Sequence, residues 1–220
     1  MAKILGIDEA GRGAVLGPLV ICGALIDEQD LPKLRALKVR DSKLLTPKRR
    51  EELQGIIKET LADHKLIKVK SIEIDAVRMS GTANLNDLEA AKMAELINHF
   101  KPSHAYLDCV DSNPLTFRAR LNKHLRVDTT LTLEHKADEN YPIVSAASIL
   151  AKVTRDSEVK SLEAKYGAVG SGYPADPTTQ KFLSNWLKQN ENYPDIVRKT
   201  WGTVTGTIGK KKQKSLEDFK

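Results

Sequence analysis

The chain has 220 residues, of which 40% are hydrophobic and 29% are charged, so it can bury a sizeable core as one domain with a small appended segment. No apolar stretch reaches the roughly 20 residues that span a bilayer, and the N-terminus leads directly into a strand pattern, so we expect a cytoplasmic protein without membrane contact. The formal net charge of +6 is compatible with a polyanionic partner such as nucleic acid. Neither Cys22 nor Cys109 lies in a CxxC spacing, which argues against a zinc site.

Strand and helix patterns alternate along the chain. Short apolar or alternating runs predict strands at 3–8, 18–26, 65–70, 103–108 and 127–133. Apolar periodicity with start and stop signals predicts helices at 47–62, 86–100, 117–123, 142–166 and 179–189. A glycine-rich turn joins the first two strands, which predicts an antiparallel pair. Because helices and strands then alternate, the pattern favours an α/β domain with a mixed sheet.

Acidic residues stand at the ends of two predicted strands. Asp8 and Glu9 end the first strand, and Asp108 ends the strand at 103–108. If these strands are parallel neighbours, their carboxylates emerge at one edge of the sheet. With Asp138, they form an oxygen-rich set without histidine, which suits Mg²⁺ or Mn²⁺ better than zinc, and pairs of such ions recur in phosphodiester hydrolysis. The sequence leaves simpler explanations open: an acidic turn, a polar strand end, and a favourable acid near a helix N-terminus.

Polar side chains follow one face of the helix predicted at 142–166. They are Ser145, Ser148, Lys152 and Arg155. A phosphate-binding face and a solvated helix face both explain this pattern.

Five short segments, spread in order along nearly the whole chain, form a specific combination. They read DEAGRG at 8–13, DSK at 41–43, YLD at 106–108, ASILAKVTRD at 147–156 and GSGYP at 170–174. Together they resemble the ribonuclease HII family, especially its archaeal branch. The resemblance implies a ribonuclease H-like α/β fold, with a mixed five-stranded sheet flanked by helices and a helical C-terminal extension. We therefore expect a catalytic domain at 1–170, a helical extension at 171–202 and a basic tail at 203–220.

The same resemblance implies an activity. The family's members are metal-dependent endonucleases that hydrolyse the RNA strand of RNA–DNA hybrids. They also cut on the 5′ side of ribonucleotides embedded in duplex DNA, which gives 3′-hydroxyl and 5′-phosphate ends. RNA–DNA hybrids and ribonucleotide-containing duplexes are therefore the expected substrates, and Mg²⁺ or Mn²⁺ is the expected cofactor.

The resemblance also assigns roles to individual residues. The family's catalytic, metal-binding carboxylates fall on Asp8, Glu9, Asp108 and Asp138. The segment that recognises the 2′-hydroxyl at an RNA–DNA junction falls on Gly11, Arg12 and Gly13, and the ring that packs on the neighbouring deoxyribose falls on Tyr173. A glycine-flanked backbone can approach the minor groove closely enough to bond a 2′-hydroxyl. We expect Lys43 and Arg155 to contact phosphates, which positions the duplex without reading its sequence.

The C-terminal residues carry a second motif. The segment 213–219 fits Q-x-x-L-x-x-F, which resembles the clamp-binding peptide of archaeal and eukaryotic replication proteins. In that arrangement Gln213 enters a polar pocket, while Leu216 and Phe219 share one face of a short helical turn and enter a hydrophobic groove. We expect a sliding clamp as partner and a monomeric enzyme. A disordered basic tail is the simpler alternative.

Two other functions compete with the nuclease. One is a non-catalytic nucleic-acid or clamp adaptor, and the other is a transposase-like or junction-cleaving nuclease with the same acidic sheet edge. Four acids favour an enzyme, because a binding module gains nothing from negative charge where phosphates lie. The Gly-Arg-Gly turn and Tyr173 favour a ribonuclease over the other nucleases.

Overall fold

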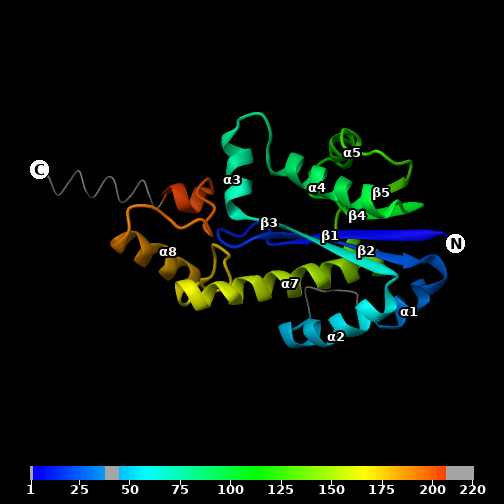
Figure 1. The fold of residues 1–220 in the computed structure, drawn as a ribbon, viewed down its shortest axis with the longest axis horizontal. Coiled ribbons are helices and arrows are strands. Elements are labelled where there is room, and N and C mark those ends of the chain that lie inside the picture. Colours follow the sequence, from blue (N-terminus) through cyan, green and yellow to red (C-terminus); the bar gives the residue numbers. More distant parts are fainter. Residues whose placement is uncertain (1, 38–44, 207–220) are drawn as a thin grey trace, which may run out of the picture. The chain divides into compact units, whose positions relative to one another are not determined.

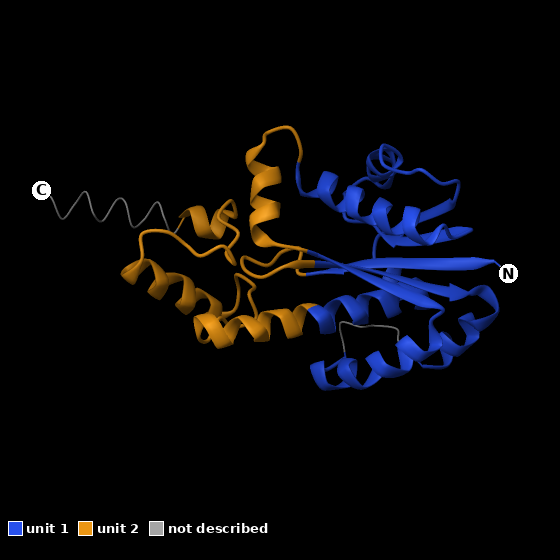
Figure 2. Cartoon of the chain, in the orientation of Figure 1, with its two compact units in different colours: residues 1–10, 20–68, 84–154 blue, residues 11–19, 69–83, 155–220 orange. Residues whose placement is uncertain are grey.

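The computed structural model describes residues 2–37 and 45–206, and the chain divides into two compact units (Figure 2). The first unit comprises residues 1–10, 20–68 and 84–154, and the second comprises residues 11–19, 69–83 and 155–220. The units are discontinuous in sequence, and the expected division into residues 1–170, 171–202 and 203–220 stays a prediction. Within the described residues, no helix combines the length and the hydropathy that crossing a membrane requires.

A mixed sheet forms the centre of the first unit. Its strands are β1 (Lys3–Ala10), β2 (Leu19–Asp27), β3 (Asp63–Val69), β4 (His104–Asp108) and β5 (Thr130–Glu134). They are ordered β3-β2-β1-β4-β5. Strand β1 pairs antiparallel with β2 and parallel with β4, and β4 pairs parallel with β5. The predicted mixed five-stranded sheet and its antiparallel first pair are confirmed.

Helices flank this sheet and build most of the second unit. They are α1 (Leu31–Ala36), α2 (Pro47–Thr60), α3 (Ser71–Met79), α4 (Leu85–Phe100), α5 (Pro114–Asn122), α6 (Ala137–Asn140), α7 (Pro142–Tyr166) and α8 (Pro177–Gln189). The five predicted helices are present, and α7 has the predicted bounds. A side-chain cap explains the start of α2, since the Thr46 hydroxyl accepts the Arg49 N–H at 3.2 Å. Helices α1, α3 and α6 were not predicted.

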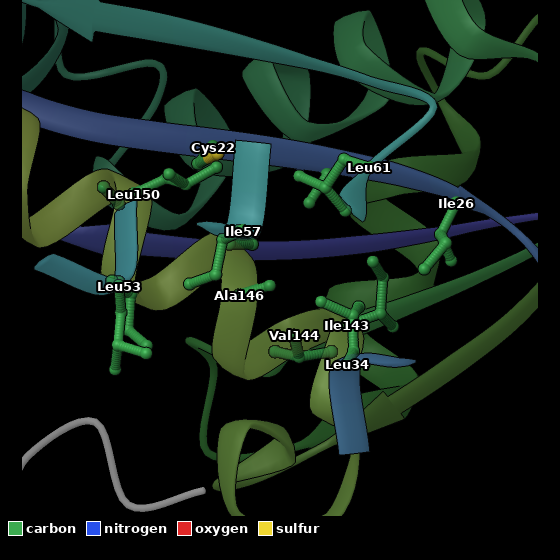
Figure 3. Close-up of a cluster of buried hydrophobic side chains, with 14 of the residues drawn as sticks. Cys22, Ile26, Leu34, Leu53, Ile57, Leu61, Ile143, Val144, Ala146 and Leu150 are labelled. Atoms are coloured by element: carbon green, nitrogen blue, oxygen red, sulfur yellow. The ribbon is translucent and has the colours of Figure 1, made fainter. Parts of the chain in front are cut away.

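One hydrophobic core cluster of the first unit lies between the sheet and the helices on one of its faces (Figure 3). Figure 1 shows α4 and α5 on one face of the sheet, and α1, α2 and the first part of α7 on the other. Buried residues of α7, such as Ile143 and Leu150, pack with Ile57 of α2 and Cys22 of β2. Contact between β1 and α7 is so close that a Cβ at Gly6 would collide with the backbone of Ile143. This packing fixes the strand that carries the first two acids.

The second unit has its own hydrophobic cluster. It combines apolar residues of the loop after β1, of the second part of α7, of the α7–α8 connection, of α8 and of the segment that follows α8: Val15, Leu16, Val159, Val169, Phe182, Leu183, Leu187, Tyr193, Val197 and Val204. The loop is therefore held by tertiary packing rather than by a regular element.

Candidate active site

Three carboxylates converge where β1 and β4 end. Asp8, Glu9 and Asp108 each offer an oxygen, and these oxygens all lie within 4.8 Å of one another. The parallel register of the two strands causes this, because Ile7 pairs with Leu107 and the next residue of each strand is an aspartate. The condition stated from the sequence is met: the two strands are parallel neighbours, and their acids lie at one edge of the sheet.

Asp138 lies beside this group, on the short helix α6. The main-chain N–H of Ala137, the preceding residue, donates to Asp108 Oδ1 at 2.9 Å. The Asp138 side chain is only 2% exposed, and its main-chain carbonyl accepts a hydrogen bond from the Ser145 hydroxyl. The 4.8 Å group contains the first three acids only, so Asp138 is a neighbour of the cluster rather than a member of it.

Burial and repulsion perturb the first of these acids. Asp8 is 5% exposed, and its desolvation, together with the charge of Asp108, raises its pKa from 3.8 to about 7. Hydrogen bonds from the Ser148 hydroxyl and from the Glu9 main-chain N–H, the latter at 2.7 Å, oppose that rise, as does the charge of Lys152. The cluster therefore accumulates negative charge that the folded chain compensates incompletely.

The polar face of α7 turns inward rather than toward solvent. Ser145 and Ser148 are fully buried, and Arg155 is 3% exposed. Lys152 Nζ donates to Ser148 Oγ at 2.8 Å, and the Ser148 hydroxyl in turn bonds to Asp8. The sequence pattern indicated this polar face but left its role open. In the structure, two of its residues, Ser148 and Lys152, are connected to the acidic cluster.

In the second unit, Arg155 joins two glycine-rich loops. Its guanidinium donates to the Ser171 carbonyl at 2.5 Å and lies 4.5 Å from the centre of the Tyr173 ring. Gly11 has a φ of 86°, and a Cβ at this position would lie 2.8 Å from Arg155 Nε and from the Pro18 carbonyl oxygen. Arg155 thus binds the protein's own loops, and its contact with phosphate stays a prediction.

The predicted recognition residues differ in their exposure. The Tyr173 side chain is 38% exposed, Gly13 is exposed, Arg12 is half-buried and Gly11 is buried. Lys43 and the clamp-motif residues Gln213, Leu216 and Phe219 lie outside the described residues.

Comparison with known proteins gives consistent matches over nearly the whole chain. The sequence model of the family described as ribonuclease HII matches residues 5–204. The ribonuclease HII of Thermococcus kodakarensis is 46% identical over 204 residues, which cover 92% of this chain and 88% of that protein. That of Pyrococcus furiosus is 44% identical over 223 residues, which cover 99% of this chain and 98% of the relative.

Solved structures of similar proteins support the same family. The ribonuclease H2 of Pyrococcus horikoshii has a TM-score of 0.88 at 44% identity, and the match covers 96% of this chain and 99% of that one. Ribonuclease HII of Archaeoglobus fulgidus, solved in a PCNA:RNase HII complex, has a TM-score of 0.82 at 39% identity and covers 90% of this chain and 95% of that one. The expected ribonuclease H-like fold is confirmed. The matched length, the fold and the acidic cluster together establish that this chain belongs to the ribonuclease HII family, whose members are endonucleases that act on RNA–DNA hybrids.

Proposed function

We propose that Asp8, Glu9 and Asp108 bind the divalent cations of this nuclease, with Asp138 as the fourth acid of the site. The convergence of three carboxylate oxygens within 4.8 Å carries this proposal. Burial removes hydration from Asp8, and the like charge of Asp108 repels its carboxylate, so that together they raise the pKa of Asp8. A bound cation relieves both effects. Because the donors are all oxygens, Mg²⁺ or Mn²⁺ fits better than zinc.

The chain's own residues orient the donors. The Glu9 N–H and the Ser148 hydroxyl hold Asp8, and the Ala137 N–H holds Asp108, so both carboxylates keep their direction before substrate arrives. Divalent ions at such a site polarise the scissile phosphodiester and lower the pKa of the attacking water. The reaction we propose is direct hydrolysis on the 5′ side of a ribonucleotide, which leaves a 3′-hydroxyl and a 5′-phosphate.

Substrate selection falls to the second unit in this proposal. The loop with Gly11, Arg12 and Gly13 recognises the 2′-hydroxyl, and Tyr173 packs on the neighbouring deoxyribose. The contact of Arg155 with the Tyr173 ring supports this, because it fixes the orientation of an aromatic side chain that remains partly exposed. Lys43 supplies a phosphate contact that positions the duplex.

We assign the C-terminal motif to a sliding clamp. The support is the Q-x-x-L-x-x-F pattern at Gln213, Leu216 and Phe219, together with the PCNA complex formed by the Archaeoglobus fulgidus relative. We further propose that the enzyme is a monomer and that it acts in the cytoplasm.

Calorimetric titration with Mn²⁺ tests the metal assignment directly. Asp8→Asn and Asp108→Asn each remove one ligand charge at constant volume, so both should weaken binding at least tenfold. Asp111→Asn is the matched control, since Asp111 follows the same strand but accepts hydrogen bonds from Asn86 at 3.0 Å and Arg120 at 3.2 Å, outside the cluster. Equal Mn²⁺ affinity in all four proteins would contradict the assignment.

A further inference from the structure

An arginine that the sequence analysis did not single out lies beneath the Gly-Arg-Gly loop, within the second unit. Arg198 is fully buried. Its guanidinium donates to the main-chain carbonyls of Gly11 at 2.7 Å, Arg12 at 2.8 Å and Gly17 at 3.1 Å. Burying a guanidinium removes its hydration, and only hydrogen bonds from its N–H groups offset that loss. The three bonds to loop carbonyls therefore mark a specific arrangement.

The main chain around Arg198 binds the same loop. The Arg198 N–H donates to the Val15 carbonyl at 2.8 Å, and Val197 forms an antiparallel bridge with Leu16. The hydroxyl of Ser71, the first residue of α3, donates to the Gly17 carbonyl at 3.1 Å and to the Ile196 carbonyl at 2.8 Å. The loop is therefore tied to the segment after α8 at several successive residues.

These bonds determine where the loop's N–H groups point. In a planar trans peptide, the carbonyl of one residue and the N–H of the next point in opposite directions. Since Arg198 draws the carbonyls of Gly11 and Arg12 toward the buried side, the N–H groups of Arg12 and Gly13 point away from it. Gly13 is exposed, so its N–H is directed toward the accessible side of the loop.

We propose that Arg198 is a positioning residue for ribonucleotide specificity, which holds two loop carbonyls inward so that the N–H groups of Arg12 and Gly13 face the substrate's 2′-hydroxyl. This inference rests on the proposed role of that loop in substrate selection. Lysine cannot replace Arg198 in this role, because a compact ammonium does not reach three carbonyls on three residues as the planar guanidinium fork does.

The test compares two affinities in the Asp8→Asn background, which prevents cleavage. Fluorescence anisotropy gives the Kd for a duplex with one ribonucleotide and for the same duplex made wholly of DNA. Arg198→Lys should reduce the ratio of the two affinities about tenfold, with the all-DNA Kd unchanged, because two hydrogen bonds to the 2′-oxygen lose their alignment. A merely structural role would weaken both affinities equally and leave the ratio unchanged.

Arg78→Lys is the matched control. Both arginines lie over the Trp201 ring, Arg78 at 4.9 Å and Arg198 at 5.0 Å from its centre. Arg78, however, donates a hydrogen bond to the Thr200 hydroxyl and not to the loop. The ratio of the two duplex affinities in Arg78→Lys should equal that of the Asp8→Asn parent. An unchanged ratio in Arg198→Lys would overturn the inference and leave the loop's role intact, whereas a parent without ribonucleotide preference would overturn the loop's role itself.

A second measurement covers the case in which Arg198→Lys does not fold. In the Asp8→Asn protein with Arg198 intact, the amide resonance of Gly13 should shift when the ribonucleotide duplex binds and stay in place with the all-DNA duplex. Equal shifts with both duplexes, or no shift with either, would overturn the loop's role in recognition and with it the inference that rests on that role.

Discussion

Asp8→Asn should stabilise the metal-free protein at neutral and alkaline pH. In the folded chain the pKa of Asp8 is raised from 3.8 to about 7, chiefly by burial and then by Asp108. Between these two values the unfolded chain has released a proton that the folded chain retains, so stability falls as pH rises from about 4 to about 7. A difference of about 3 pKa units corresponds to about 4 kcal/mol of destabilisation above pH 7.

Asparagine removes the charge and keeps an acceptor for the Glu9 N–H. It weakens the hydrogen bond from Ser148, at a cost of about 1 kcal/mol, so the expected net gain is about 3 kcal/mol at pH 8 and close to zero at pH 4. For a chain of this length, that gain raises Tm by about 6–12 °C at pH 8.

Thermal unfolding followed by circular dichroism, in the presence of chelator, measures this difference at pH 4, 6 and 8. Asp111→Asn serves as control and should lower Tm, since it removes an ion pair with Arg120. Addition of Mn²⁺ should reduce the Tm difference between Asp8→Asn and wild type at pH 8, because the ion stabilises the wild type more than the variant. A gain that is absent at pH 8, or equal at pH 4 and pH 8, would refute the electrostatic account of the cluster.

Three further predictions follow from packing, capping and the tail. Gly6→Ala should lower the free energy of unfolding by about 3 kcal/mol in urea titrations, because its methyl group collides with the backbone of Ile143; an unchanged urea midpoint would contradict this. The main-chain N–H of Ser171 is the chief cause that lowers the pKa of Asp176 to about 2, so the stability that this carboxylate adds is present above pH 4 and lost as pH falls toward 2. Asp176→Asn should therefore lower Tm at pH 7, and the Tm difference from wild type should narrow below pH 4. A Tm difference that stays constant with pH would contradict this. Deletion of 213–220 should leave kcat/KM on free duplex unchanged and weaken clamp binding in surface plasmon resonance; full-length affinity in the truncated protein would argue against the motif.

Much of the fold follows from local signals in the sequence. Strand patterns and helix caps are local properties, which is why the bounds of α7 were predicted and why α2 begins after Thr46 as expected. Helix α3 was missed because a distant segment secures it: Asp75 accepts the N–H groups of Lys199 at 2.7 Å and Thr200 at 3.1 Å. No local pattern carries information about such a partner.

The residues of the candidate site also differ in how far the sequence predicts them. Asp8 and Asp108 were predictable, because each ends an apolar strand and parallel strands present their carboxyl ends at one edge of the sheet. The role of Arg198 was not, because its bonds join the segment after α8 to a loop near the start of the chain. The sequence gives little signal for it, because Arg198 follows Val197 but precedes Lys199, and a solvated basic pair is an equally good explanation.

Cleavage of labelled duplexes tests the central claim most directly. Three substrates are compared, namely a DNA duplex with one ribonucleotide, the all-DNA duplex and a long RNA–DNA hybrid, each with Mg²⁺, Mn²⁺ or chelator. The account predicts metal-dependent cutting of both ribonucleotide-containing substrates, on the 5′ side of the single ribonucleotide, with loss of activity but retained duplex binding in Asp8→Asn and Asp108→Asn. Cutting that persists in chelator or in these variants would contradict the metal site built on the three carboxylates, and cutting of the all-DNA duplex would contradict 2′-hydroxyl recognition.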